Sequence, residues 1–192
     1  MSEEKQVVYD PDGYDLVTDA LRALIAQYPG LERGENFGFS TAPTGAGKAI
    51  FPITGAVIQS EIESITGHVT QLCQYPFTAL FRASGLSQKN RVNAKEWLDT
   101  FGRWLEKQAV IIDNMKYVLR DYPVLRTVGE YDNFEYREVY EDGVLGNHPL
   151  QGVRKILNIA RQTPAFLNSV NEDKSEDWII SMVLTYQNEF DR

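Results

Sequence analysis

The sequence predicts an α+β fold in which a mainly antiparallel sheet packs against two amphipathic helices. Three observations lead to this class. Apolar residues recur at helical spacing over residues 16–28 and 88–108, and they alternate at strand spacing over residues 58–83 and 155–187. The elements follow in the order helix, strands, long helix, variable segment, strands. We expect a single domain over residues 1–192, with residues 126–152 forming a hairpin or insertion within it.

The two helical segments differ in length and in their end signals. In the first, Asp15 or Thr18 is a candidate N-cap, and Pro29-Gly30 ends the run. The second covers about 20 residues, or about 30 Å. Its apolar stripe is typical of a core face, with charged residues on the rest of the surface. The stripe consists of Trp97, Leu98, Phe101, Trp104 and Leu105.

A β-rich block lies between the two helices, beginning at residues 36–41 and resuming from Ala49. Over residues 58–65, Ile58 and Ile62 are expected on one face and Glu61 and Glu63 on the other. Residues 66–68 predict a hairpin turn into a long strand over 69–83. Pro76 lacks an amide donor, so the pattern predicts an edge position, a bulge or a break there.

The C-terminal third is again β-prone. Residues 155–170 favour strand on both sides of Pro164, and the polar run 171–177 indicates a turn. A final strand is predicted by clean alternation of one apolar set with the intervening residues. That set is Trp178, Ile180, Met182, Leu184 and Tyr186.

Composition restricts the compartment and the partners. The one cysteine, Cys73, allows neither an internal disulfide nor a paired-cysteine zinc site, which fits a reducing cytosol. The chain has no long uncharged apolar run and begins with an acidic segment, so we expect neither membrane spanning nor secretion. A net charge of −8 argues against a broad surface for gripping nucleic acid.

The segment TAPTGAGK, residues 41–48, resembles a phosphate-binding loop, but two of its four defining residues are missing. Ala42 stands where the leading glycine belongs, and Ala49 stands where a hydroxyl residue would bind Mg²⁺. The residues that follow predict strand rather than a long helix. We interpret the segment as a mobile glycine-rich turn between strands. A small nucleotide-binding protein or enzyme that uses residues 41–49 is the alternative function.

Candidate catalytic residues are few. His68 and Cys73 lie five apart, so one regular strand would place them on opposite faces, and His148 lies in a turn-like segment. Ser40 follows Gly38-Phe39 as in a nucleophile elbow, but no helix is predicted after it. We therefore expect no enzyme activity, no cofactor and no metal site.

Two groups of residues are candidates for contacts. Glu61 and Glu63 would lie about 7 Å apart on one strand face, where they could form a carboxylate pair, although alternating polar residues are also typical of the wet face of a half-buried strand. The acidic, aromatic segment 130–142 is an interface candidate, because exposed aromatic residues anchor protein contacts. An exposed hairpin is the alternative for that segment. Its candidate contact residues are Tyr131, Phe134, Tyr136 and Tyr140.

Two regions together resemble the tail terminator proteins of long-tailed, non-contractile bacteriophages, which are also described as minor capsid or head–tail joining proteins. Residues 58–108 contain a hairpin, then YPF at residues 75–77, then WLDTFGRWLE at residues 97–106. Residues 163–190 end in YQNEF at residues 186–190. The likeness lies in this pattern of elements, and residues 128–152 depart from it.

The resemblance implies a tail-terminator-like fold of the lambda type and a structural, non-enzymatic role. Such a protein assembles in the host cytoplasm into a homo-oligomeric ring, expected to be a hexamer, at the head-proximal end of the virion tail. There it caps the tail tube, ends tail polymerisation and contacts the head–tail connector proteins. DNA would pass through the ring without sequence-specific binding, and Glu61 and Glu63 would be candidates for the lumen.

Overall fold

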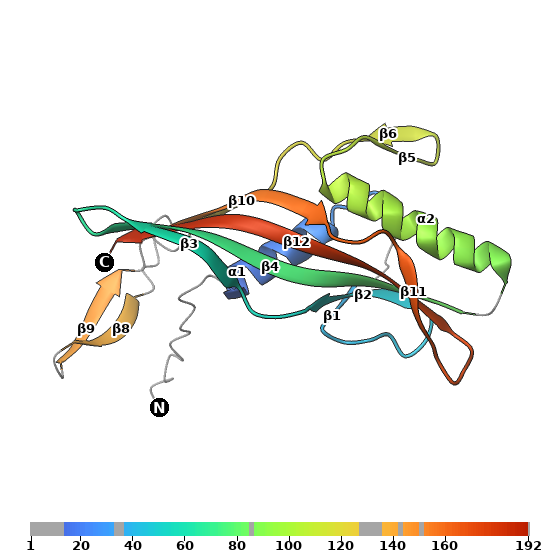
Figure 1. Ribbon diagram of the computed structural model, residues 1–192, viewed down its shortest axis with the longest axis horizontal. Helices are drawn as coiled ribbons and strands as arrows, with labels where there is room; N and C mark the ends of the chain where they lie inside the picture. The colour runs from blue at the N-terminus through green and yellow to red at the C-terminus, as the bar shows by residue number, and fades with distance from the viewer. Residues whose placement is uncertain are drawn as a thin grey trace, which may run out of the picture.

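The computed structural model describes residues 14–32, 37–84, 87–126, 136–141, 144–149 and 152–191. Within these ranges the centre is an eight-stranded sheet in the order β1-β2-β4-β12-β10-β7, with β3 also paired to β4 and β11 to β12 (Figure 1). All of its pairings are antiparallel except that of β1 with β2. The strands are β1 (Phe37–Phe39), β2 (Gly47–Pro52), β3 (Val57–Glu63), β4 (His68–Ala83), β7 (Val124–Arg126), β10 (Gly152–Arg161), β11 (Phe166–Val170) and β12 (Glu176–Asp191). The expected α+β class with a mostly antiparallel sheet is confirmed.

Strands β4 and β12 form the long axis of the sheet. Each has 16 residues, and they pair without a register shift from Glu176 opposite Ala83 to Asp191 opposite His68. At about 3.3 Å per residue the pair extends about 50 Å. On the outer side of β4, β2 and β3 pair in succession, and on the outer side of β12, β10 and β11 do so. The sheet is therefore built from two long, bent hairpins whose turns lie at opposite ends.

Both helices cover the same face of this sheet. Helix α1 (Tyr14–Ile25) contacts that face through the Thr18 hydroxyl, which lies 3.0 Å from the Tyr75 hydroxyl. Helix α2 (Gln88–Leu105) approaches so closely that a Cβ on Gly102 would lie 2.9 Å from the Cδ1 of Ile180. Alternate residues of β4 and β12 supply the sheet side of the core, as their periodicity predicts. The fully buried sheet residues include Cys73, Tyr75, Phe77, Ala79, Ile180, Met182, Leu184 and Tyr186.

The predicted apolar stripe of α2 is the helix side of that core. Leu98, Phe101, Trp104 and Leu105 are buried, and Trp97 is half-buried. The ring of Tyr28, just after α1, packs edge-on against Trp97 and Phe101 at centroid distances of 5.3 and 5.1 Å. Such aromatic pairs add about 0.5–1.5 kcal/mol each beyond the area they bury. The aromatic cluster therefore fastens the two helices to each other.

The ends of the helices agree only in part with the sequence signals. Ser87 caps α2, because its hydroxyl accepts a hydrogen bond from the Asn90 amide at 3.2 Å. Helix α1 begins at Tyr14, so the predicted caps Asp15 and Thr18 both lie inside it, and that expectation is wrong. Thr18 instead uses its hydroxyl to contact the sheet.

The prediction for Pro76 is also wrong, because β4 is central, unbroken and free of a bulge at that residue. The Ile53 amide donates to the Pro76 carbonyl at 3.0 Å, so the backbone groups of Pro76 point away from β12. On that side β2 ends at Pro52 opposite Phe77, and β3 starts at Val57 opposite Gln74. The missing donor therefore lies opposite the gap between two neighbouring strands.

Two further hairpins form small sheets of their own. Strands β5 (Val110–Ile112) and β6 (Met115–Tyr117) pair beside α2 (Figure 1). Strands β8 (Tyr136–Glu141) and β9 (Val144–Pro149) pair antiparallel from Tyr136 opposite Pro149 to Glu141 opposite Val144. Within the described ranges, β8 and β9 pair with no other strand.

Candidate interaction surfaces

The phosphate-loop-like segment connects β1 to β2, so the expected turn between strands is present. Lys48 lies within β2, opposite Phe81 of β4, and is almost fully buried. Its Nζ lies 4.7 Å from the ring centroids of both Phe81 and Trp97. This arrangement directs the ammonium to aromatic faces in the protein interior, where cation–π attraction stabilises it.

The same loop is anchored at Pro43, although the residues on either side of it, 41–42 and 44–46, are exposed. The Arg82 Nη1 donates to the Pro43 carbonyl, and the same guanidinium holds Asp177 in a two-pronged pair at 2.7 and 2.8 Å. The chain after the loop is strand β2 and not a helix. A phosphate loop needs both a free lysine head and a following helix N-terminus, so this geometry favours a structural role for residues 41–48.

The other catalytic candidates are separated in space. Cys73 is buried in the core and His68 is exposed, and the two residues point to opposite faces of β4, as predicted. Ser40 directly follows β1 and has a positive φ of 55°, and its amide donates to the Ile50 carbonyl at 2.8 Å. The loop to β2 follows it, so the strand–turn–helix of a nucleophile elbow is not formed. His148 lies in β9, and its side chain is outside the described part of the chain.

Glu61 and Glu63 lie on a different face from the one predicted relative to Ile58. A bulge between Ile58 and Ser60 inserts Gln59, so Ile58 pairs with Cys73 while Glu61 pairs with Gln71. Ile58, Glu61 and Glu63 therefore share the face of the sheet that the helices cover elsewhere, and Ile62 lies on the opposite face. The strand is also not half-buried, because all seven residues of β3 are exposed. The simple alternation fails because one extra residue inverts every later side chain.

Glu61 is the outer member of a polar row that crosses three strands. The Gln71 Nε2 donates to the Glu61 Oε2 at 2.6 Å, and the Asn188 Nδ2 donates to the Gln71 Oε1 at 2.9 Å. Gln71 and Asn188 are both buried. This network gives Glu61 a fixed position on the arm formed by β3 and the first half of β4.

The aromatic interface candidates lie only partly within the described structure. Tyr131 and Phe134 lie outside it. Tyr136 and Tyr140 lie on β8, two positions either side of Glu138, so the backbone places all three positions on one face of the β8–β9 hairpin.

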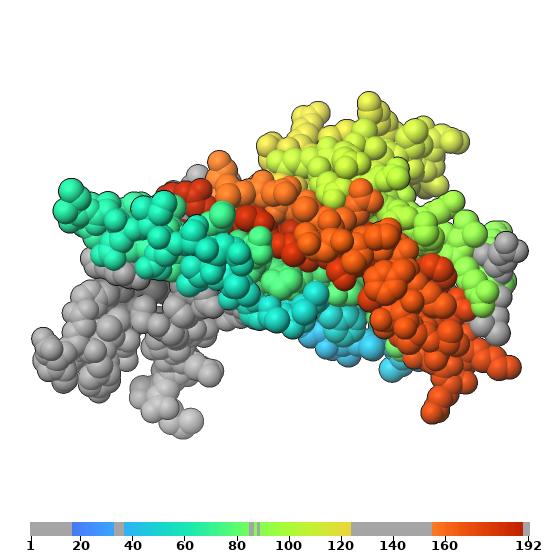
Figure 2. Space-filling view, in the orientation of Figure 1, coloured from blue at the N-terminus to red at the C-terminus, as the bar shows by residue number. Residues whose placement is uncertain are grey.

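Exposed aliphatic residues gather at the two ends of the sheet. At one end, the β3–β4 arm carries Ile62, which is 71% exposed, and at the hairpin turn Ile65, which is fully exposed. At the other end, β11 has the sequence FLNSV with no charged residue, and Phe166, Leu167 and Val170 are all exposed. Figure 2 shows the arm (teal) and the β11 region (orange) at opposite ends of the molecule. Native edge strands usually carry charges that prevent pairing, so β11 is a candidate contact edge.

A further exposed apolar group, which the sequence pattern did not indicate, lies on the β5–β6 hairpin. Ile111 is 74% exposed and Met115 is 56% exposed. The two-residue turn Asp113-Asn114 is a signal that could have revealed the hairpin, because both residues tolerate positive φ.

No group of three or more His, Cys, Asp or Glu residues suited to a metal ion occurs among the described residues. In the same part of the chain, none of the helices combines the length and the apolar character needed to span a bilayer. No protein-family model matches the sequence, and no curated protein matches it.

Proposed function

We propose that this chain is a structural subunit that associates head-to-tail with copies of itself to form a closed ring. The observation that carries the proposal is the pair of different exposed aliphatic surfaces at opposite ends of one sheet, the β3–β4 arm and β11. A contact between two unlike surfaces repeats from subunit to subunit, and it closes into a ring when the rotation allows. Clustered exposed apolar residues are typical of protein contacts.

We further propose that the ring caps the tail tube of a long-tailed phage, ends its polymerisation and contacts the head connector. The resemblance of residues 58–108 and 163–190 to tail terminators supports this role, and so does the order of elements, in which a hairpin leads into the YPF strand β4 and then into α2. A tail-terminator-like fold would provide this arrangement. Lys48, which the nucleotide-binding alternative requires, is buried against aromatic rings, and this contact disfavours that alternative.

Electron microscopy of phage tails assembled with and without this chain tests the role directly. We expect tails of uncontrolled length, without attached heads, when the chain is missing. The double variant Ile62→Lys/Ile65→Lys should fail to restore normal tails, because charge on the arm opposes burial at a subunit contact. Val92→Lys is a matched control, since Val92 is an exposed aliphatic residue on α2, away from the arm. Normal tails without the chain would contradict the proposal.

Glu61 and Glu63 are proposed to face the lumen, where their negative charge would keep passing DNA from adhering to the wall. Both residues are exposed on the arm, and Gln71 holds the Glu61 carboxylate in place. Glu61→Lys/Glu63→Lys should slow DNA exit and reduce infectivity, whereas Glu61→Gln/Glu63→Gln should have a weaker effect because it adds no attraction for phosphate. Equal DNA release by the lysine variant and the unmodified protein would contradict the lumen assignment.

A further inference from the structure

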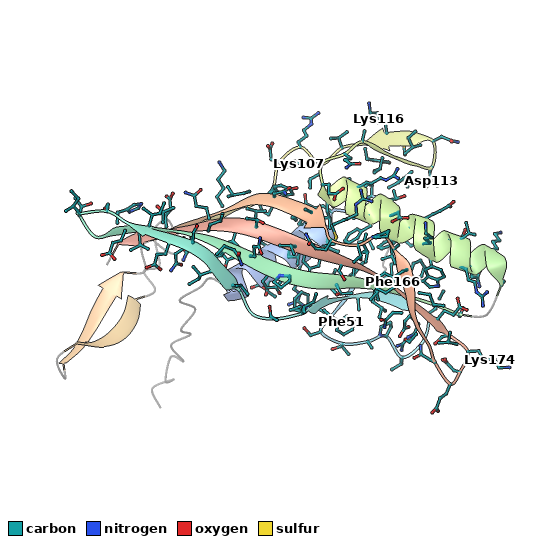
Figure 3. The ribbon with its side chains drawn as sticks, viewed as in Figure 1. Phe51, Lys107, Asp113, Lys116, Phe166 and Lys174 are labelled. Atoms are coloured by element: carbon teal, nitrogen blue, oxygen red, sulfur yellow. The ribbon has the colours of Figure 1, made fainter. Side chains whose placement is uncertain are left out.

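The β5–β6 hairpin presents a preformed surface that the fold itself does not need. Its inner face packs on the core through Val110, which is buried, and through Ile112 and Tyr117, which are half-buried. Register places Ile111 opposite Lys116 on the other face. Ile111 therefore points outward at 74% exposure, next to a lysine that is also exposed. Figure 3 shows Lys116 and Asp113 on this hairpin, beside α2.

The surface is held rigidly at its tip and at its base. Asp113 and Asn114 form the two-residue turn with φ values of 49° and 63°, which match the twist of a tight hairpin. At the base, the Tyr122 hydroxyl donates to the Leu105 carbonyl at 2.6 Å and accepts from the Ile159 amide at 3.3 Å. The Lys107 Nζ lies 4.1 Å from the Tyr122 ring centroid. A partner would meet a surface that requires little ordering, which favours affinity.

The hairpin region is basic within an acidic protein. Residues 107–120 contain three basic residues and one acidic residue, so their net charge is +2, while the whole chain carries −8. Exposed apolar side chains lie between these charges, with Met115 at 56% and Val118 at 47% exposure. A partner suited to this surface would combine negative charge with aromatic or aliphatic side chains.

One segment of the chain has this character. Residues 130–142 contain six acidic residues and one basic residue, a net charge of −5, together with three tyrosines and one phenylalanine. Part of the segment forms β8, in the two-stranded β8–β9 hairpin. An isolated two-stranded hairpin is marginally stable in water and gains from packing against a surface.

We infer that the outward face of the β5–β6 hairpin, formed by Ile111 and Lys116 and continued by Val118, is the docking site for segment 130–142 of a second copy of this chain. The inference rests on the proposed self-association and names the residues of one subunit contact. Aromatic side chains of the segment cover the aliphatic residues, and its carboxylates approach the ammonium group of Lys116. In the proposed ring this contact runs head-to-tail, from the hairpin face of one subunit to segment 130–142 of the next.

Two variants of the full chain test this assignment. Ile111→Asp/Lys116→Glu changes only the outward face of the hairpin, and Tyr136→Ser/Tyr140→Ser changes only the segment. Sedimentation at increasing concentration should show assembly of the unmodified chain and loss of assembly by each variant alone. An equal mixture of the variants should form dimers and nothing larger, because one intact hairpin face and one intact segment remain between the two chains. Val92→Asp is the control and should assemble like the unmodified chain.

A labelled peptide of residues 130–142 measures the contact without requiring ring closure. It should bind the Tyr136→Ser/Tyr140→Ser chain, weaken as salt rises, and lose at least tenfold in affinity when Ile111→Asp/Lys116→Glu is added. Unchanged peptide binding in that combined variant would overturn the inference. Peptide binding that depends on Ile111 and Lys116, together with no dimers in the mixture of the two variants, would also overturn it, because the contact would then lie within one chain. Neither result alters tail capping, which the tail microscopy tests separately.

Discussion

Arg91 joins α2 to the start of β12, and its removal should cost more stability than any other single change to the polar contacts of α2. Its guanidinium donates to both oxygens of Glu176 at 2.6–3.0 Å. The Glu176 side chain is only 1% exposed, and its carboxylate also accepts a hydrogen bond from the Trp178 Nε1 at 3.3 Å. Arg91→Met would therefore leave a carboxylate buried without its cation.

The size of the effect follows from these contacts. Removing one partner of a buried ion pair typically costs about 3–5 kcal/mol. The Arg91 side chain is 45% exposed, so water compensates in part, and we expect a loss of about 2–4 kcal/mol in the free energy of unfolding. In a chain of this length, a loss of 3 kcal/mol corresponds to a fall in Tm of about 6–12 °C.

Urea titration at pH 7 and calorimetry measure the loss. Lys95→Met is the control, because it removes an exposed pair with Asp99 at 3.3 Å on the same helix and should cost less than about 0.5 kcal/mol. Arg91→Met/Glu176→Met should recover much of the stability, since no buried charge remains. If Arg91→Met were as stable as Lys95→Met, the reasoning about Glu176 would be refuted.

Three further predictions concern stability. Hydrogen bonds from their arginine partners lower the pKa of Glu176 and of Asp177. The stabilisation that these carboxylates give the folded state is therefore complete above their ordinary pKa values of 4.5 and 3.8, and it is lost as the pH falls through the lowered pKa values. Acid titration of the unfolding free energy should show a decline that begins below about pH 5 and is smaller in Glu176→Gln. Lys107 follows the C-cap residue of α2 with a φ of 61°. Lys107→Gly should therefore be more stable than Lys107→Ala by about 1 kcal/mol in urea titration, although both lose the contact with Tyr122. Gly102→Ala should lower Tm although alanine has the better helix propensity, because the new Cβ would lie 2.6 Å from the Arg161 Cδ. An unchanged or raised Tm would show that the Arg161 side chain moves aside at little cost in free energy.

Regular periodicity made most of the fold predictable. Helix α2 and strands β4 and β12 keep one face apolar over many residues, so the prediction of which face is buried is confirmed for each. The failures occur where one backbone event overrides the pattern. The bulge at Gln59 moved Ile58 to the face of Glu61, and Pro76 is accommodated by a gap in the adjacent strands that no local pattern reveals.

The candidate contact surfaces were harder to predict, because exposure depends on the whole fold. Ile62 and Ile65 read as ordinary strand and turn residues, and only the structure shows them projecting on an arm. Ile111 lies between Val110 and Ile112, and all three residues are apolar, so the sequence does not show which of them points outward. Register with β6 decides this, since it places Ile111 opposite Lys116.

The proline in β4 also lies beside a change of register in its neighbours. A strand that continued from β2 past Pro52 would lack one hydrogen bond at Pro76, and the flanking chain leaves the ladder there and rejoins it at Val57. The two strands therefore pair with β4 in registers that differ by two residues, because residues 53–56 lie between Pro52 and Val57 while only Tyr75 and Pro76 lie between Gln74 and Phe77. Pro76→Ala would restore the amide proton but leave these two extra residues in place, so the gap between β2 and β3 should persist.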